Sequence, residues 1–516
     1  MNTAVRGARS ARPRRTAHIP AGHRAAWASR IPLLRAVLLD ERRDSGPDDR
    51  HAAGGLPDAL RDVVDPCNRA HVWLTLAVLT GRLPDRTTVV EVARADEFDG
   101  GLTLWRAVVD LTTRESAAWT VRVAVDEVLV DLAHTASTVL TTGIQRVARE
   151  TARRWLRDHA LTPVSWSNGF QSIRELTAIE RERIEQGRAE EDVDARPEAT
   201  VVVPWRCTYV VPELAAEPAR SARLLALAEL TPNRTGVIGF DCVPITSAET
   251  THVGFAAVFA GNLAAIRHFD RVATISGAAA AEYSGWRSSL SAIGISGPLI
   301  EAIPLPVEAA VPDADDLAAA SARFLVGGLP LVLVVGSHEP RKNHLAVLHA
   351  AELLWREGLQ FSLSFVGGNA WGSEGFTRRV LELQRQGRPV DTESRLSDGQ
   401  LWAAYRLAWC TLFPSFNEGF GLPVAESLGA GTPAITSSFG SMAELAAEGG
   451  ALTCDPHDDH SLAAALRTML TDDIVHTRLS EEAKRRPTRT WDMYAAKVWD
   501  FLVEHATGPT SDPEQA

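Results

Sequence analysis

The amino-acid sequence predicts an α/β protein with two nucleotide-type lobes and a mainly helical N-terminal extension. At 516 residues the chain is too long for one ordinary hydrophobic core. Two separate stretches, beginning near residues 121 and 329, each open with a buried apolar strand that is followed by a loop and an amphipathic helix. Repeated strand-loop-helix units of this kind are typical of sheets covered by helices on both faces.

The composition narrows the class of protein. A hydrophobic content of 45% and a charged content of 23% are typical of a soluble globular chain. The net charge of -12 argues against nucleic acid as the main partner. No run of about 18 apolar residues is present, so no membrane-spanning helix is expected. The five cysteines lack CxxC spacing, which favours a reducing, cytoplasmic compartment and no zinc site.

The N-terminal region divides into a tail and an extension. Residues 1–20 are rich in arginine and are expected to form a disordered basic tail, and no apolar segment follows directly, so no secretion signal is expected. Alternatively, the tail anchors the protein on the anionic inner leaflet of the membrane, to which Trp27–Leu39 would add an apolar face unless it is a packed helix. Residues 21–118 have no assigned role, although Ala70–Leu83 is expected to form a buried helix that ends near Gly81.

The first lobe is expected over residues 119–306. Val123–Leu132 alternates and then becomes apolar, as a buried parallel strand would, and Ile144–Leu156 has helical apolar spacing. Residues 177–198 are rich in Glu and Arg and indicate a solvated helix or insertion. Further short strands are expected at Val201–Val203, Tyr209–Val211, Gly236–Phe240 and Arg271–Ile275.

A linker over residues 307–326 and a second lobe over residues 327–490 follow. The expected strands of this lobe are Pro330–Gly336, Phe361–Gly367, Cys410–Phe413 and Pro433–Thr436. The expected helices are His344–Trp355, Ser397–Trp409 and Ser461–Leu470. Residues 491–516 are expected to form a terminal helix and a tail.

The segment Phe413–Thr436, FPSFNEGFGLPVAESLGAGTPAIT, carries two acids, Glu418 and Glu426. Glycines on both sides of Phe420 allow the chain to turn sharply and to approach a ligand closely. Pro423 is compatible with a helix start, and the free amides of a helix N-terminus attract anions such as phosphate. The segment therefore predicts a ligand-facing turn with two acidic hydrogen-bond acceptors.

This pattern resembles the donor-binding segment of retaining nucleotide-sugar glycosyltransferases of family 4, the glycosyl transferases group 1, which have the GT-B architecture. The resemblance implies two Rossmann-like lobes facing a cleft, with Glu418 at the transferred sugar and Glu426 at the nucleotide ribose. Alternatively, both acids are solvated in an ordinary strand-turn-helix. Four neighbouring residues count as donor-binding candidates: Gly419, Phe420, Gly421 and Leu422.

The segment GSHEPRKN at 336–343 resembles a second motif of the same family. A departing nucleoside diphosphate needs its charge neutralised by a metal or by basic residues. The resemblance implies this role for Arg341 and Lys342 and places Ser337 in the donor site; alternatively, the two basic residues are solvated at a helix start. No Asp-x-Asp stands where a metal would be needed, so metal-independent transfer without a cofactor is expected.

Three other segments also resemble the family. TTGIQRVARE at 141–150 implies that Gly143 lets backbone amides approach the donor phosphate, with help from Thr142 and Arg146. Alternatively, Thr142 caps the helix and Arg146 lies on its surface. SRLSD at 394–398 lies where relatives hold the nucleotide base, which makes Arg395 a donor-site candidate. In FDCVP at 240–244, Phe240 replaces the usual His, while Asp241 is expected either to orient the acceptor hydroxyl or to hold a turn. His134 is a possible substitute for the missing His.

The resemblance implies an enzyme that moves a hexose from a nucleotide-sugar donor to a glycan, lipid-linked or small-molecule acceptor with retention of anomeric configuration. The subgroup that carries the T-G-I-Q-R-V segment includes bacterial polysaccharide mannosyltransferases, which favours mannose as the sugar. A catalytically silent subunit that binds glycans or assists assembly is the alternative.

Overall fold

The computed structural model describes residues 20–45, 59–138, 142–186 and 200–504. The predicted basic tail lies almost wholly outside these residues, as does most of the second half of the charged segment 177–198. The chain divides into two compact units. The first unit contains the N-terminal region to Val125 together with residues 166–175 and 196–205, and the second contains residues 126–165, 176–195 and 206–516.

The first unit is mainly helical, which confirms the expected N-terminal extension. Its helices are α1 (Ala21–Ser45), α2 (Arg69–Thr80), α3 (Arg86–Asp99), α4 (Leu102–Leu111) and α5 (Arg114–Ala117). Its strands are β1 (Thr120–Val125), β4 (Ile173–Glu175) and β5 (Thr200–Trp205), with β5 parallel to β1 and antiparallel to β4. The Asn68 side chain caps the start of α2, and Gly81 ends that helix in the left-handed region at φ 71°.

Helix α1 packs its apolar face inside the first unit. Trp27, Leu34 and Leu38 are buried, and Trp27 Nε1 donates a hydrogen bond to Thr112 Oγ1 at 3.1 Å. The buried Arg30 donates to the Leu79 carbonyl at 2.9 Å. Of the two alternatives for Trp27–Leu39, the structure therefore shows the packed helix. Its apolar side is buried in the first unit and is not free to lie on a membrane.

The N-terminal lobe of the second unit is built on a parallel sheet in the order β3-β2-β6-β7-β8-β9. These strands are β2 (Val128–Asp131), β3 (Thr162–Trp166, whose last residue belongs to the first unit), β6 (Thr208–Val211), β7 (Arg234–Gly239), β8 (Arg271–Thr274) and β9 (Leu299–Ala302). The single strand expected at Val123–Leu132 is wrong. The chain breaks there at Asp126, which adopts φ 55°, so β1 and β2 are separate strands.

The helices of this lobe are α6 (Ala133–Ser137), α7 (Gly143–Asp158), α8 (Ala178–Gln186), α9 (Pro218–Leu230), α10 (Val243–Thr246), α11 (Phe255–Ile266) and α12 (Gly277–Leu290). A buried ion cluster fixes the start of α6. Arg220 lies 2.9 Å from Asp131 and 2.8 Å from Glu213. Glu213 in turn accepts hydrogen bonds from the backbone of His134 at 2.7 Å and of Thr135 at 2.8 Å. Buried charges of this kind need such partners.

The C-terminal lobe has a parallel sheet in the order β12-β11-β10-β13-β14-β15. Its strands are β10 (Leu331–Val335), β11 (Ser362–Val366), β12 (Val390–Glu393), β13 (Cys410–Phe413), β14 (Ala434–Ser437) and β15 (Ala451–Cys454). Its helices are α13 (Ala314–Phe324), α14 (His344–Arg356), α15 (Glu374–Arg385), α16 (Asp398–Leu407), α17 (Leu422–Gly429), α18 (Gly440–Ala447), α19 (Asp459–Thr471) and α20 (Asp473–Lys484).

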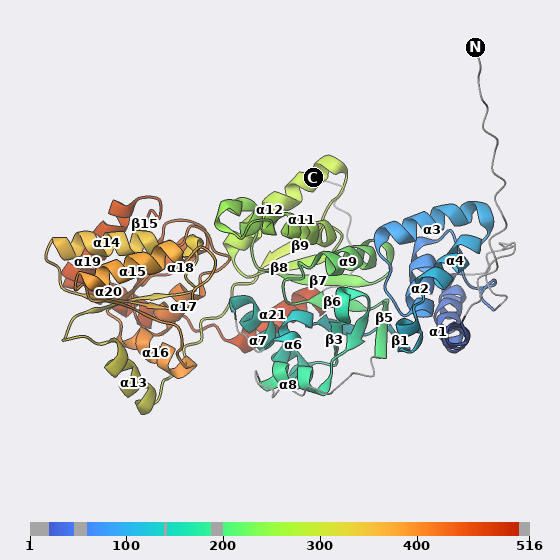
Figure 1. Cartoon of the computed structure of the whole chain (residues 1–516), viewed down its shortest axis with the longest axis horizontal. Coiled ribbons are helices and arrows are strands. Elements are labelled where there is room, and N and C mark those ends of the chain that lie inside the picture. Colours follow the sequence, from blue (N-terminus) through green and yellow to red (C-terminus); the bar gives the residue numbers. More distant parts are fainter. Residues whose placement is uncertain (1–19, 46–58, 139–141, 187–199, 505–516) are drawn as a thin grey trace, which may run out of the picture. The chain divides into compact units, whose positions relative to one another are not determined.

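Helices cover both faces of this sheet (Figure 1). One core joins the sheet to α14, α15, α19 and α20, and a second core joins it to α13 and α16. Residues 307–326 are expected to form a linker, but most of this stretch is the helix α13. Ala320 and Phe324 of this helix are buried against Leu331 and Trp402.

The end of the described chain returns to the N-terminal lobe. Helix α21 (Trp491–Trp499) continues into a π-helical turn at Asp500–Glu504. Trp155 of α7 donates from Nε1 to the Ala495 carbonyl at 2.8 Å, and its ring meets that of Trp499 at a centroid distance of 5.6 Å. The terminal helix therefore completes the hydrophobic core of the N-terminal lobe.

Candidate functional site

The centre of the candidate site lies where β10 and β13, neighbouring parallel strands, reach their carboxyl ends. The loop after β10 supplies Arg341 and Lys342, and the loop after β13 supplies Glu418. Lys342 Nζ donates to Glu418 Oε1 at 2.6 Å, and Arg341 Nη1 lies 2.5 Å from Glu418 Oε2. Ser415 Oγ donates to the same Oε1 at 2.6 Å. Both oxygens of the carboxylate are therefore held by positive or polar donors.

This arrangement keeps Glu418 ionised. Burial alone would raise the pKa of its carboxyl, but the charges of Arg341 and Lys342 outweigh burial and lower that pKa to about 2. Burial also lowers the pKa of Lys342, against the opposing attraction of Glu418. The Lys342 amine lies 4.6 Å from the centroid of the Phe413 ring, which forms the apolar wall behind it.

A second acid from the other lobe faces this cluster. Asp241 follows β7 in the N-terminal lobe, and its Oδ1 accepts a hydrogen bond from its own turn, at the Val243 amide, 3.1 Å away. Burial raises the pKa of Asp241 to about 6, with the charge of Arg341 acting in the opposite direction and that of Glu418 adding to the rise. The structure thus brings together the four residues that the sequence predicts as catalytic.

Gly419 lets the two loops meet. A Cβ at this position would lie 2.4 Å from the Phe240 carbonyl oxygen and 3.0 Å from Asp241 Oδ2. The Gly419 carbonyl also accepts a hydrogen bond from Ser276 Oγ at 2.6 Å. The next glycine, Gly421, adopts φ 89° immediately before α17, a conformation that favours glycine. The sharp turn expected at these glycines is present, whereas their close approach to a ligand stays a prediction.

Glu426 lies on α17 and is bound by side chains from two elements. Arg146 Nη1, from α7, lies 2.5 Å from Glu426 Oε1, and the Tyr405 hydroxyl of α16 donates to Oε2 at 2.9 Å. The carboxylate is thus oriented by a cation and a hydroxyl. The sequence places Arg146 beside the donor phosphate or on the helix surface, and in the structure it lies against Glu426. Tyr405 is not among the site residues predicted from the sequence.

The remaining donor-site candidates lie around these two acids. Gly143 is the first residue of α7, whose cap is Thr142, and a Cβ on it would meet Leu422 at 3.3 Å. Phe420 is buried in the core shared by α17 and α21. Ser337 is exposed directly after β10, and Arg395 is exposed after β12, two strands away from β10 in the sheet. These two residues share the sheet edge of the cluster, and their role in the donor site stays a prediction.

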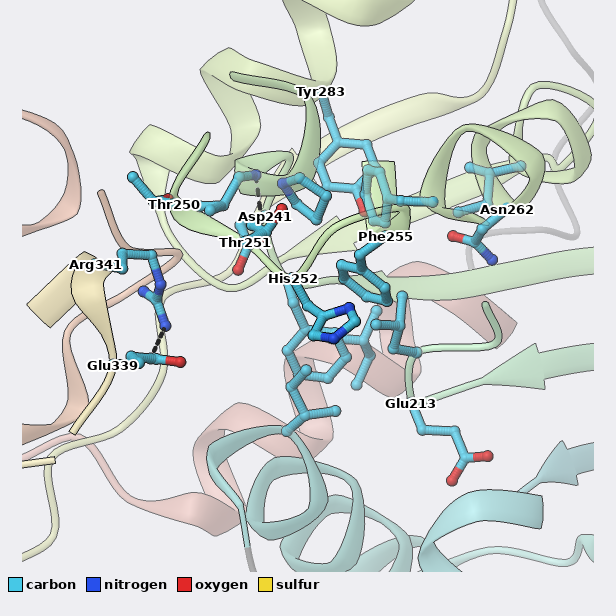
Figure 2. Close-up of a pocket in the computed structure, with 18 of the residues that line it drawn as sticks. Glu213, Asp241, Thr250, Thr251, His252, Phe255, Asn262, Tyr283, Glu339 and Arg341 are labelled. Carbon is cyan, nitrogen blue, oxygen red and sulfur yellow. Dashed lines mark hydrogen bonds and ion pairs between the residues drawn. The ribbon is translucent and has the colours of Figure 1, made fainter. Parts of the chain in front are cut away.

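A cavity of about 370 Å³ opens beside the cluster. Figure 2 shows Arg341 and Glu339 on one side of it, Asp241 and His252 in the middle, and Asn262 on the other side. His252 lies in the loop before α11, where no sequence motif predicts it. His134, the substitute expected for the family His, is the second residue of α6. Its Nδ1 lies 3.8 Å from Glu217 Oε1, and it does not line the cavity.

Comparison with known proteins supports a transferase. Residues 320–486 match the family model "Glycosyl transferases group 1". The O-antigen chain mannosyltransferase B of Escherichia coli is 32% identical over 142 residues, which are 27% of this chain and 37% of that protein. The D-inositol 3-phosphate glycosyltransferase of Corynebacterium glutamicum is 31% identical over 197 residues, 36% of this chain and 47% of that protein. The matches thus span less than half of each relative.

Solved structures show the same fold. HepE of Anabaena, in complex with UDP and glucose, superposes with a TM-score of 0.51 at 12% identity, covering 74% of this chain and 100% of that one. Sucrose-phosphate synthase of Thermosynechococcus elongatus gives a TM-score of 0.50 at 15% identity, covering 74% of this chain and 97% of that one. Among the described residues, no helix is both long and apolar enough to cross a membrane. The fold is GT-B, and residues 320–486 carry the similarity to the glycosyl transferases group 1.

Proposed function

We propose that this protein transfers a hexose from a nucleotide-sugar donor to an acceptor hydroxyl with retention of anomeric configuration. The observation that carries the proposal is the contact of Glu418 with Lys342 and Arg341 at the carboxyl ends of β10 and β13. Ligands of open α/β sheets bind at this edge. A carboxylate there can accept from the sugar hydroxyls, while the two cations neutralise the departing diphosphate.

In the proposed reaction the acceptor oxygen attacks the anomeric carbon on the face from which the diphosphate leaves. The bond from that carbon to the diphosphate oxygen breaks, and this oxygen takes the proton of the acceptor hydroxyl. Arg341 and Lys342 hold the negative charge that develops on the leaving group, so the proposed transfer needs no metal ion. Asp241 orients the acceptor hydroxyl, and Glu426 holds the ribose. The exclusion of water between the lobes limits hydrolysis of the donor.

Mannose is the favoured sugar of this proposal, because mannosyltransferases of Escherichia coli are among the proteins similar to this chain. The alternative is a catalytically silent subunit, which Phe240 favours because it replaces the His of the family motif. The position of Glu418, Lys342 and Arg341 at the carboxyl ends of the strands, where ligands of such sheets bind, argues for an active site.

Thermal unfolding of the purified chain with GDP, UDP, dTDP and ADP, and with their sugar conjugates, tests the proposal. A ligand that binds the native state raises the apparent stability by mass action. We expect one nucleotide to raise the melting temperature and Glu426→Ala to abolish that rise. Turnover of the matching nucleotide sugar separates an enzyme from a silent subunit, which would bind without turnover. No rise with any nucleotide would contradict the donor site.

A further inference from the structure

The cavity beside the cluster has a strongly asymmetric lining. Asp241, Glu339 and Arg341 of the candidate site line one side of it, and Glu213, Thr250, Thr251 and His252 add further polar groups. Most of the remaining wall is apolar, and it includes Val237, Ile238, Phe240, Phe255, Phe259 and Ile266. A cavity of about 370 Å³ lies within the range of ~300–1,000 Å³ that is usual for small-molecule pockets.

Phe240 contributes directly to the apolar part of the cavity wall. It follows β7, lies next to Asp241, and is 7% exposed in the cavity wall. At this position the resembling segment carries His, so the present chain has an aromatic hydrocarbon where the family has a polar ring. The substitution makes the cavity less suited to a polyhydroxylated molecule. A buried hydroxyl without a partner costs about 1–3 kcal/mol.

One polar side-chain atom on the side of the cavity away from Arg341 has no hydrogen-bond partner among the described residues. Asn262 of α11 is 4% exposed, and its Nδ2 donates to the Ala215 carbonyl at 2.8 Å. Its Oδ1 is buried without a hydrogen-bond partner. Figure 2 shows this amide on the side of the cavity away from Arg341. A buried acceptor of this kind is stabilised when a ligand brings a hydrogen-bond donor to it.

We propose that the acceptor is a compact molecule with an apolar body, a reacting hydroxyl at one end and a hydrogen-bond donor at the other. The hydroxyl lies at Asp241, the apolar body fills the cavity against Phe240 and Phe255, and the donor group reaches Asn262 Oδ1. A free sugar would leave hydroxyls unpaired against the apolar wall. A plain lipid chain would leave Asn262 unpaired. This inference rests on the proposed function, because it assigns the acceptor of that same site.

Isothermal titration of the full chain with four probes tests the inference: 2,6-dihydroxynaphthalene, 2-naphthol, farnesol and D-mannose. The first probe has an apolar body with a hydroxyl at each end. We expect it to bind saturably and roughly 2- to 10-fold tighter than 2-naphthol, which is the worth of one hydrogen bond. D-mannose is expected not to bind. Three outcomes would overturn the inference. D-mannose alone binds saturably, farnesol binds more tightly than both naphthalenes, or none of the probes binds.

Two variants link the binding to the cavity. Asn262→Leu removes the unpartnered oxygen and is expected to abolish the preference for 2,6-dihydroxynaphthalene over 2-naphthol. Phe255→Ser removes an apolar wall without touching the Asn262 bond to Ala215, and it is expected to weaken both naphthalenes by about tenfold or more. Val253→Ser is the matched control, because Val253 lies two residues away, is 93% exposed and is outside the cavity wall. An unchanged affinity in Phe255→Ser would overturn the inference.

The nucleotide experiment on the same preparation separates the two proposals. If a nucleotide raises the melting temperature but the naphthalenes do not bind, the donor site stands and the acceptor inference is wrong. If the naphthalenes bind and no nucleotide does, the cavity binds apolar ligands, but the proposed transferase function and the acceptor role that rests on it are both wrong.

Discussion

Lys342 donates a hydrogen bond to Glu418 at 2.6 Å although the two residues are 76 positions apart. The contact joins the loops that follow two neighbouring parallel strands, β10 and β13. Arg341 binds the other oxygen of the same carboxylate, and it also lies 2.8 Å from Glu339 of its own loop. The two cations at this edge are therefore paired with two carboxylates, which hold Arg341 and Lys342 in place.

Removing the Glu418 carboxylate is expected to abolish measurable transfer. Glu418→Ala takes away the group proposed to hold the sugar and should lower the rate of transfer by at least ~10²-fold, the effect of losing one group that stabilises a transition state. Initial rates measure this loss, with the nucleotide sugar that raises the melting temperature as the donor. Glu418→Gln is the control, since its amide oxygen still accepts from Lys342 and Ser415. Circular dichroism should show both variants folded, and full activity in Glu418→Ala would contradict the site assignment.

Tyr405 is expected to tune nucleotide affinity through Glu426. Tyr405→Phe removes the hydroxyl that donates to Glu426 Oε2 at 2.9 Å, so the carboxylate is less firmly oriented. The dissociation constant of the nucleotide should rise by roughly 3- to 10-fold, which corresponds to about 1 kcal/mol. Tyr494→Phe is the matched control, because the buried Tyr494 hydroxyl has no partner among the described residues. Its loss should leave nucleotide affinity unchanged and should not lower stability. Equal affinity in both variants would refute the role of Tyr405.

Asp241 is expected to make stability and activity depend on pH. Burial is the main cause that raises the pKa of the Asp241 carboxyl from 3.8 to about 6 in the folded protein. The folded protein therefore binds the proton of this carboxyl more tightly than the unfolded chain does. The contribution of Asp241 to stability is therefore fully present below pH ~4 and is lost as pH rises through 6. Asp241→Asn, which stays neutral, should raise the free energy of unfolding at pH 7 by about 1–3 kcal/mol relative to the original protein.

Denaturant unfolding of Asp241→Asn at pH 4 and pH 7 measures this effect, and the stability gain should disappear at pH 4. Transfer by the original protein should slow as pH falls below 6, because the proposed role requires the ionised carboxylate. A gain in stability that is equal at both pH values would contradict the assignment of the proton to Asp241.

Gly419 is expected to tolerate no side chain. In Gly419→Ala the new methyl would lie 2.4 Å from the Phe240 carbonyl oxygen, so one of the two loops must move away. We expect the free energy of unfolding to fall by about 1–3 kcal/mol. The rate of transfer should also fall in the protein that remains folded, because the loop carries Glu418. Gly285→Ala is the control, since Gly285 lies within α12 with nothing within 4 Å of the added atom. That change should stabilise the protein by ~0.5–1 kcal/mol.

Chelation of divalent metal is expected to leave the rate of transfer nearly unchanged, since Arg341 and Lys342 are proposed to neutralise the leaving diphosphate. Initial rates with and without EDTA measure this. A rate that falls with EDTA and returns with added Mg²⁺ or Mn²⁺ would show that the two cations do not suffice.

Local patterns predicted most of the C-terminal lobe. The apolar runs near Leu333 and Phe365 became β10 and β11, and the Ser397 start signal became the capped first turn of α16. These elements are specified by short-range periodicity and capping chemistry. The presence of Glu418 and Lys342 in one site followed from motif position, whereas their ion pair and the lowered pKa of Glu418 needed the fold.

The sequence predictions fail where a single backbone angle or a contact between distant segments decides the structure. The break at Asp126 depends on a positive φ that the alternating apolar pattern around it conceals. Helix α13 was expected to be a linker because its sequence is acidic at the start, yet Phe324 is buried against residues that follow it by many positions. Tyr405 is not predicted as a site residue, because its contact with Glu426 arises only when α16 and α17 pack together. His252 is not predicted, because only the fold brings its loop to the cavity wall.

The packing of Trp155 against Trp499 constrains the order in which the protein can be made. The ribosome makes the strands of the N-terminal lobe before the second lobe, but it makes the helix that finishes their core only after that lobe. The C-terminal lobe, in contrast, is continuous along the chain and can mature on its own. During synthesis, the first lobe must therefore stay soluble with an open apolar face until the second lobe has been translated.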